Sequence, residues 1–388
     1  MGSKSTSLRR PSCLTRTVLL LLLSAITSSV LASCSSAIPA SSVTHGGSHS
    51  TNIWFHVDGN RILEPNGEQF APYGFVLWCL SSPRLTCNSA RTSDRRKILV
   101  AATYWHANTV RLQVAWEHLF GAGNSVNRSY LRSLDGEVAL ANHHHMVAIV
   151  TLQTERYRGS LFPDTHALSF WRFMARHFEH NPMVFFDLFN EPRLGGPLAR
   201  AWRVWRDGGT VRTPKGVETY VGMQQLVGVI RGAGARNVII AEGIKKDTLL
   251  TGVPMLKGTN IAYGIEPSLR PSGPVPDVTP RQWQANWAAL SNRVPIMMEA
   301  FLDAPGSSAC NPRSPSLLPK LLQYLKMRHL GLIYFSLSSG LAVIGHDLER
   351  PTTFPTSRYD CSAKSRTSIQ GPGQDLLNWF RANSRPVG

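Results

Sequence analysis

The sequence has little cysteine, and it lacks several motifs that would fix a class of function. Six cysteines in 388 residues exclude a disulfide-dense mini-protein. No Cys-x-x-Cys pair or Cys/His spacing typical of a zinc site occurs. No Gly-x-Gly-x-x-Gly follows the first apolar run, which disfavours a dinucleotide-binding sheet. Because 43% of the residues are hydrophobic, the chain can build a large core and is not intrinsically disordered.

Acidic residues are scarce relative to basic ones. The chain has 24 Asp and Glu against 41 Lys and Arg, for a formal net charge of +17. Four bases and no acids lie within residues 1–33, so the remaining chain carries +13. The arginines are scattered, with no block of five or six, which favours a bias in composition over a nucleic-acid surface. We therefore expect no nucleic-acid partner.

The first 34 residues have the pattern of an export signal. A basic stretch precedes an apolar run at Val18–Ile26, and small residues follow up to Cys34. The apolar run is shorter than the ~20 residues of a membrane span. Leu31-Ala32-Ser33-Cys34 resembles a bacterial lipobox, in which Cys34 is lipidated; the alternative is cleavage near Ala37 or Ala40 without a lipid.

These features predict the domain organisation. We expect a signal peptide at 1–34, a flexible linker at 35–52 that is rich in Ser, Ala, Gly and His, and one folded domain at 53–388. The protein should be secreted or held at the cell surface, with membrane contact only through a lipid on Cys34. We expect a monomer.

Four cysteines lie in the expected domain, and their even number indicates two disulfides in an exported chain. Of the three possible pairings we favour Cys79–Cys87 and Cys310–Cys361. The run His143-His144-His145 indicates a polar helix end before a strand, because adjacent residues do not share one face on which to bind a metal.

Eight short apolar runs follow a predicted β-hairpin at 53–70, whose turns are Asp58-Gly59 and Asn66-Gly67. Their starts average about 37 residues apart, which suits a strand, a crossover helix and two loops. Residues 169–181 and 220–234 have helical patterns, and 199–216 reads as a long loop. The fold class is therefore α/β, a single (β/α)8 TIM barrel with a short N-terminal hairpin. The runs begin near Ala71, Ala107, Met146, Met183, Asn237, Asn260, Val294 and Gly331.

Catalytic groups of such barrels lie at the carboxyl ends of the strands. Glu191 and Glu299 each end a strongly apolar run, so both should be partly desolvated. Glu242 and Glu266 end two other runs, where each could equally form an ion pair at the rim. Two facing carboxyl groups suit glycosidic bond cleavage, in which one holds a proton and the other is ionised.

These motifs resemble those of the family-five glycoside hydrolases, the cellulase-like retaining (β/α)8 enzymes. Asn190-Glu191-Pro192 matches the family's Asn-Glu-Pro signature, Glu299 its nucleophile position and Val110-Arg111-Leu112 its second-strand motif. The resemblance implies that Glu191 is the general acid/base, that Asn190 contacts the sugar 2-hydroxyl, and that Arg111 steadies Glu299. It spans about residues 53–382 and includes the opening hairpin.

The substrate shell departs from the family pattern. Gln153 stands where the third strand usually ends in His, Glu266 and Ser268 replace the His and Tyr of the sixth strand, and Phe335 replaces a sugar-stacking Trp. Glu266 could bind a basic or polyol group of a sugar, or pair with Arg270. Further candidate contacts to the sugar are Trp78, Trp116 and Tyr263, and Trp202 with Trp205 as a second platform.

The sequence thus predicts a retaining glycosidase for a β-linked poly- or oligosaccharide. Arg111 should favour the charged form of Glu299, and burial should keep Glu191 protonated. No metal or organic cofactor is implied, because the chemistry needs only carboxyl groups and water. The alternative is a carbohydrate-binding barrel that has lost activity.

Overall fold

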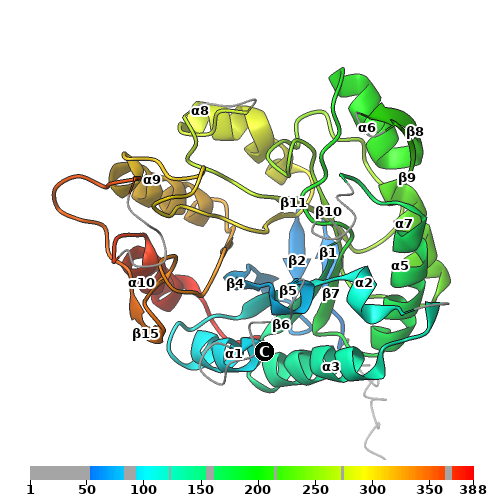
Figure 1. Cartoon of the computed structure of the whole chain (residues 1–388), viewed down its shortest axis with the longest axis horizontal. Helices are drawn as coiled ribbons and strands as arrows, with labels where there is room; N and C mark the ends of the chain where they lie inside the picture. Colours follow the sequence, from blue (N-terminus) through cyan, green and yellow to red (C-terminus); the bar gives the residue numbers. More distant parts are fainter. Residues whose placement is uncertain are drawn as a thin grey trace, which may run out of the picture. The chain divides into compact units, whose positions relative to one another are not determined.

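Eight parallel strands form a nearly closed barrel at the centre of the domain (Figure 1). The computed structural model describes residues 53–82, 93–121, 124–153, 161–213, 216–271, 275–362 and 369–388. All eight apolar runs form barrel strands, as predicted. In chain order these are β4 (Tyr73–Leu77), β5 (Thr109–Val114), β6 (Val147–Leu152), β7 (Val184–Asp187), β10 (Ile239–Glu242), β11 (Ile261–Ile265), β12 (Ile296–Met298) and β13 (Leu332–Tyr334).

The pairing of strands is least complete between β12 and β13, the seventh and eighth strands of the barrel. The sheet runs in the order β12-β11-β10-β7-β6-β5-β4-β13, and β12 meets β13 only beyond its own end. There Phe301 bridges Tyr334, with hydrogen bonds of 2.9 Å to Ile333 and from Phe335. Closure is therefore made at the carboxyl end, next to the residues that follow β12.

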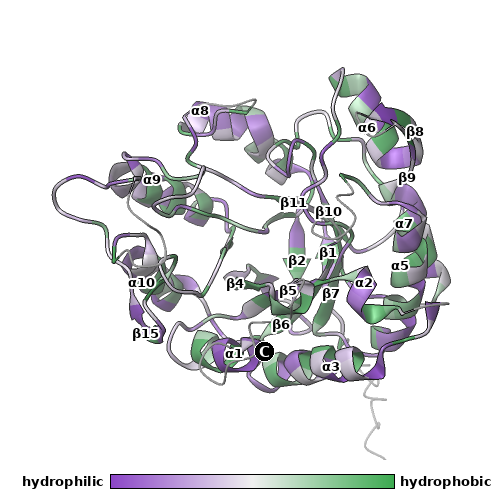
Figure 2. Ribbon diagram, viewed as in Figure 1, coloured by the Kyte–Doolittle hydropathy of each residue, from purple (hydrophilic) through white to green (hydrophobic). Residues whose placement is uncertain are grey.

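Helices surround the strands, and each carries apolar and polar faces (Figure 2). Their buried residues pack on the outward side chains of the barrel, as the helical patterns at 169–181 and 220–234 predicted. Within the described residues no helix is both long and apolar enough to cross a membrane. The helices are α1 (Asp94–Thr103), α2 (Trp116–Leu119), α3 (Arg128–His143), α5 (Thr165–Phe178), α6 (Leu198–Asp207), α7 (Met223–Gly232), α8 (Pro280–Trp283), α9 (Ser314–Lys326) and α10 (Gly373–Asn383).

A small antiparallel sheet closes the amino end of the barrel. The predicted hairpin forms β1 (His56–Asp58) and β2 (Arg61–Leu63), and β3 (Gln69–Phe70) adds a third strand. Phe55 and Phe70 pack edge-on against Phe185 inside the barrel, with ring centroids 5.0 and 5.6 Å away. The barrel floor is thus filled from below, which leaves the carboxyl end for chemistry.

The prediction of a long loop at 199–216 was wrong. This segment forms α6 and the antiparallel hairpin of β8 (Gly208–Thr213) and β9 (Gly216–Val221). The indoles of Trp202 and Trp205 are buried and donate to the carbonyls of Thr251 and Glu242, so they are not an exposed sugar platform. The tryptophans that suggested a sugar contact instead anchor α6 to the barrel.

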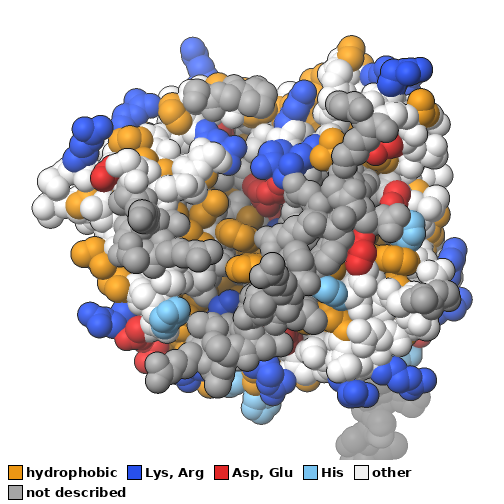
Figure 3. Space-filling model, viewed as in Figure 1, with side chains coloured by type: hydrophobic (Ala, Val, Ile, Leu, Met, Phe, Trp, Pro, Cys, Tyr) orange, Lys and Arg blue, Asp and Glu red, His pale blue; other side chains and the backbone are white. Residues whose placement is uncertain are grey.

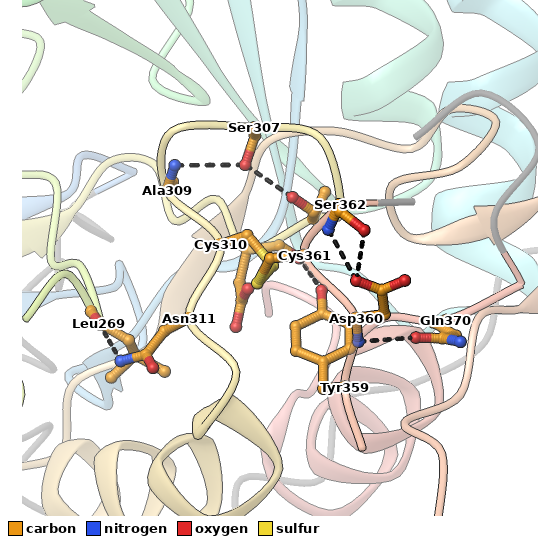
Figure 4. The surroundings of a disulfide bond; sticks show 12 residues. Leu269, Ser307, Ala309, Cys310, Asn311, Tyr359, Asp360, Cys361, Ser362 and Gln370 are labelled. Carbon is orange, nitrogen blue, oxygen red and sulfur yellow. Dashed lines mark hydrogen bonds between the residues drawn. A yellow bond between two sulfur atoms is a disulfide. The ribbon is translucent and has the colours of Figure 1, made fainter. Parts of the chain in front are cut away.

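One of the two predicted disulfides is present. Cys310 and Cys361 are joined, at a sequence separation of 51, as Figure 4 shows. Cys87 lies outside the described residues, so its pairing with Cys79 stays a prediction, as do the signal peptide and linker. His143 ends α3 and β6 begins at Val147, as expected of a polar helix end. A second short hairpin, β14 (Val343–Ile344) and β15 (Asp347–Pro351), follows the barrel.

Candidate active site

Arg111 is the centre of a buried group of charges at the carboxyl end of the barrel. It points inward from β5 and has no solvent exposure. Its Nε and Nη2 donate to Asp187 Oδ2 at 3.1 and 2.7 Å, and Nη2 also contacts Glu242. Glu299 Oε2 lies 3.1 Å from Nε, and Glu266 Oε1 lies 3.8 Å from Nη1. The structure therefore brings Arg111 and Glu299 together, as the resemblance implied.

The carboxyl groups around Arg111 outnumber it. Oxygens of Asp187, Glu242 and Glu299 lie within 4.8 Å of one another, as do those of Glu242, Asp247 and Glu266. Each trio has the oxygen ligands that a cation would need, but Arg111 forms ion pairs with members of both. One guanidinium cannot balance this many buried anions, so several of these carboxyl groups must hold protons.

Burial dominates the acid strength of the candidate nucleophile. The pKa of Glu299 is raised well above its usual range by burial and by Asp187, and Arg111 opposes this rise. The pKa of Glu242 is raised by burial in the same way. Arg111 therefore acts in the expected direction on Glu299, but burial outweighs it.

Glu191 lies at the same end of the barrel, in the segment that follows the last residue of β7, Asp187. Its backbone N–H donates to Glu242 Oε2 at 2.5 Å, so Glu242 adjoins both catalytic candidates. Its own carboxylate accepts from Arg193 Nη2 at 2.5 Å and lies 3.4 Å from Lys246 Nζ. With φ of 51°, Glu191 has a left-handed backbone, which turns its side chain into the pocket above the strands.

A pocket of about 270 Å³ opens above this group of charges. Asn190 lines it and accepts a hydrogen bond of 2.9 Å from Gln113 Nε2. Glu266 lines it too, and burial together with Glu191 raises its pKa to about 8, against the effects of Arg111 and Lys246. The other lining residues are Gln113, Gln153, Glu191, Arg193, Lys246, Thr248, Pro267, Ser268, Arg270, Ala300, Leu302, Ser308, Ala309 and Phe335.

Five predicted site residues do not line this pocket, and one of them is Arg111, which lies in the buried group of charges. Glu299 is completely buried, although the next residue, Ala300, lines the pocket. Tyr263 packs beside Trp205 and its hydroxyl accepts from the Leu256 N–H. Trp116 packs against Phe120, and its indole donates to Ser169. Trp78 comes directly after β4, ahead of a short 3₁₀ turn.

Sequence reasoning missed Asp187, Asp247, Arg193 and Lys246. Asp187 had a usable signal, since it is the single acid in the apolar run Val184–Asp187 and points inward like Phe185 two residues earlier. The other three lie in loops whose path follows only from the fold.

Comparison with known proteins decides the family. The family model described as cellulase, glycosyl hydrolase family 5, matches residues 67–313. The chain belongs to glycosyl hydrolase family 5. No curated protein sequence matches it.

Solved structures of this family share the barrel. A β-glucanase from Saccharophagus degradans in complex with cellotetraose is 17% identical, with a TM-score of 0.63 over 85% of this chain and 93% of that one. An endocellulase from Pyrococcus horikoshii is 14% identical, with a TM-score of 0.60 over 86% and 99%. An endoglucanase catalytic domain from Thermobifida fusca is 15% identical, with a TM-score of 0.56 over 84% and 97%. At these identities the likeness establishes the fold alone.

Proposed function

We propose that this family-five chain is a retaining glycoside hydrolase that cleaves a β-linked glycan by double displacement. Glu299 is the nucleophile and Glu191 the general acid/base. The observation that carries the proposal is the ion pair of 3.1 Å between Arg111 and Glu299 at the barrel end where Glu191 also lies. The cellotetraose bound to three similar structures supports an oligosaccharide substrate.

The reaction follows from these positions. Glu191 donates a proton to the glycosidic oxygen while the Glu299 carboxylate attacks the anomeric carbon, which gives a glycosyl-enzyme. Glu191 then takes a proton from water, whose oxygen displaces Glu299 from the sugar. Because burial raises the pKa of Glu299, the ionised form needed for attack depends on Arg111. We assign the binding of a sugar hydroxyl to Asn190, and its hydrogen bond from Gln113 and its position in the pocket lining support this role.

The products formed with azide test both roles. Glu299→Ala should abolish hydrolysis of aryl β-glycosides, and azide should restore turnover by direct displacement, giving an α-glycosyl azide. Glu191→Ala should lower kcat/KM by about 10²–10⁴, and azide should attack the glycosyl-enzyme to give the β-glycosyl azide. The exposed Glu349 provides the control, since Glu349→Ala should leave kcat/KM unchanged. Full activity of Glu299→Ala would exclude it as the nucleophile.

A carbohydrate-binding barrel without turnover is the second candidate. Two observations favour it: Glu299 is completely buried, and the carboxylate of Glu191 is held by Arg193 and Lys246. A panel of β-glucan, mannan, xylan and aryl glycosides separates the two candidates. Binding without hydrolysis, unchanged by Glu191→Gln, would establish the second.

We also propose that the protein is exported, with residues 1–34 as the signal. The Cys310–Cys361 disulfide supports this, because such bonds persist in oxidising compartments. In a bacterial host, intact mass spectrometry of the full-length product should show a chain that begins at Cys34 with attached acyl groups. Cys34→Ser should abolish the acyl groups. A product that retains Met1 would contradict export, and cleavage near Ala37 or Ala40 would exclude the lipid.

A further inference from the structure

Arg270 presents an unpaired guanidinium to the pocket. It lies in the loop after β11, is half-buried, and lines the pocket together with Ser268. Its Nε is shielded from solvent and has no hydrogen-bond partner among the described residues. Among the described residues no carboxylate lies within ion-pair distance of it, so the pairing with Glu266 considered from the sequence does not form. A shielded donor without an acceptor is costly unless a ligand supplies one.

The other two cations of the pocket are engaged. Arg193 and Lys246 both face Oε2 of Glu191, at 2.5 and 3.4 Å. Glu266 does not offset Arg270, because a pKa of about 8 leaves it mainly protonated at neutral pH. The pocket therefore keeps an excess positive charge at Arg270. Figure 3 shows basic side chains gathered beside an acidic patch near the centre of the viewed face.

Ser268 provides a second donor on the same wall. Its Oγ is buried and has no hydrogen-bond partner in the part of the chain that the structure describes, and the residue is only 7% exposed. Its backbone N–H donates to Asp277 Oδ2 at 3.1 Å, which fixes its position. Two unsatisfied polar groups, Arg270 Nε and Ser268 Oγ, thus lie on one wall of the pocket.

The loop that carries them is held from both sides. The Asp277 N–H donates to the Arg270 carbonyl at 3.1 Å. Asn311, which follows Cys310 of the disulfide, donates from Nδ2 to the carbonyl of Leu269 (Figure 4). The wall is therefore fixed before any ligand arrives, which lowers the entropic cost of binding.

We infer that the pocket binds a β-linked glycan bearing a carboxylate, as in a uronic acid residue, with Arg270 as the residue that selects it. The planar fork of Nε–H and Nη–H matches the two oxygens of a carboxylate, and Ser268 Oγ–H can donate to one of them. The net charge of +13 that the chain carries beyond residue 33 also attracts an acidic polymer. The inference rests on the proposed function only for the β-linked backbone of the ligand.

A matched pair of ligands tests this selection. Cellohexaose and the same hexamer oxidised to carboxylates at C6 differ only in charge at that carbon. Binding is titrated calorimetrically to full-length Glu299→Gln, so that no turnover disturbs the measurement. The oxidised hexamer should bind at least about tenfold more tightly at low salt, the lower bound for a charged hydrogen bond of ~1.5 kcal/mol.

Three variants in the same background locate the effect. Arg270→Gln should erase the preference, and Arg270→Lys, which retains charge but loses the fork, should keep part of it. Arg293→Gln removes an equal charge from an exposed position at the opposite end of β12, and the preference should persist. Circular dichroism confirms folding, and if Arg270→Gln unfolds, the Arg270→Lys result decides.

The outcomes separate this inference from the proposed hydrolase. Equal binding of both hexamers, no binding of either, or a preference that survives Arg270→Gln would overturn the inference. Hydrolysis of cellohexaose by the unaltered chain without charge preference would uphold the hydrolase and reject Arg270 selection. Binding that depends on Arg270, without hydrolysis of either hexamer, would uphold the selection by Arg270 and reject the hydrolase.

Discussion

Arg111 determines how many of the buried carboxyl groups can be ionised at once. Four acids contact or adjoin its guanidinium, and all but Glu266 are completely buried. Each added negative charge in this low-dielectric space raises the cost of the next one, so the protons of the group are shared. The sugar-cleaving role proposed for Glu299 is therefore a property of the whole group.

The absence of a side chain at Gly264 leaves room for the buried carboxyl groups of Glu299 and Glu242. A Cβ at this position would lie 2.9 Å from Glu299 Cγ and 3.0 Å from Glu242 Cγ, closer than ordinary contacts. Gly264→Ala should push both carboxyl side chains away from Arg111 and destabilise the fold by about 1–3 kcal/mol. It should also lower kcat, and the fold-change in kcat should exceed the fold-change in KM. Urea unfolding and steady-state kinetics measure the two effects.

A second glycine is the matched control for this substitution. Gly228 lies on an exposed turn of α7, and nothing lies within 4 Å of a Cβ built there. Gly228→Ala should stabilise the protein by about 0.5–1 kcal/mol, because alanine has the higher helix propensity. Activity should not change. Equal effects of the two alanines would show that Gly264 does not act through the carboxyl groups.

At the scale of elements, the loops after β11 and β12 form one wall of the pocket. Ser308 and Ala309 line it directly before Cys310, whose disulfide ties this loop to residue 361 (Figure 4). Asn311 then holds Leu269 of the neighbouring loop. The disulfide thus holds the chain that directly follows one wall of the pocket.

The sequence predicted the barrel strands well because each is an apolar run whose length matches one crossing of the core. The catalytic candidates Glu191, Glu299 and Arg111 were accessible for the same reason, since they end or interrupt such runs. The segment 199–216 was misread because its tryptophans and arginines have no clear strand alternation. Its helix depends on contacts from Trp202 and Trp205 to distant carbonyls, which no local pattern reveals.

The pocket wall could not be predicted for a related reason. Ser268 could be identified as a departure from the family motif and Arg270 as a residue close to it in sequence. That Ser268 Oγ and Arg270 Nε have no hydrogen-bond partner among the described residues follows only from the packing. Whether Glu266 pairs with Arg270 or Arg111 is likewise decided by how β5 and β11 approach each other across the barrel. The local sequence can identify such residues as candidates, but which contacts they form depends on the assembled barrel.

For the whole molecule, buried acids make stability depend on pH in an unusual direction. The pKa values of Asp277 and Asp303 are each raised to about 7 by burial, and that of Glu266 to about 8. The folded chain keeps protons that the unfolded chain releases above pH ~4. The unfolded state then binds fewer protons, so these groups lower the free energy of unfolding as pH rises from about 4 to 8.

Asp303, which does not itself line the pocket, tests this dependence. It is completely buried, and the hydroxyls of Tyr334 and Tyr359 donate to its carbonyl rather than to its carboxyl group. Asn cannot ionise, so the stability of Asp303→Asn relative to the unaltered chain should increase by about 2 kcal/mol between pH 5.5 and 8. Urea unfolding at four pH values across this range measures the difference. A difference that stays constant with pH would mean that Asp303 does not retain its proton in the folded chain, and any loss of stability toward pH 8 would then have another origin.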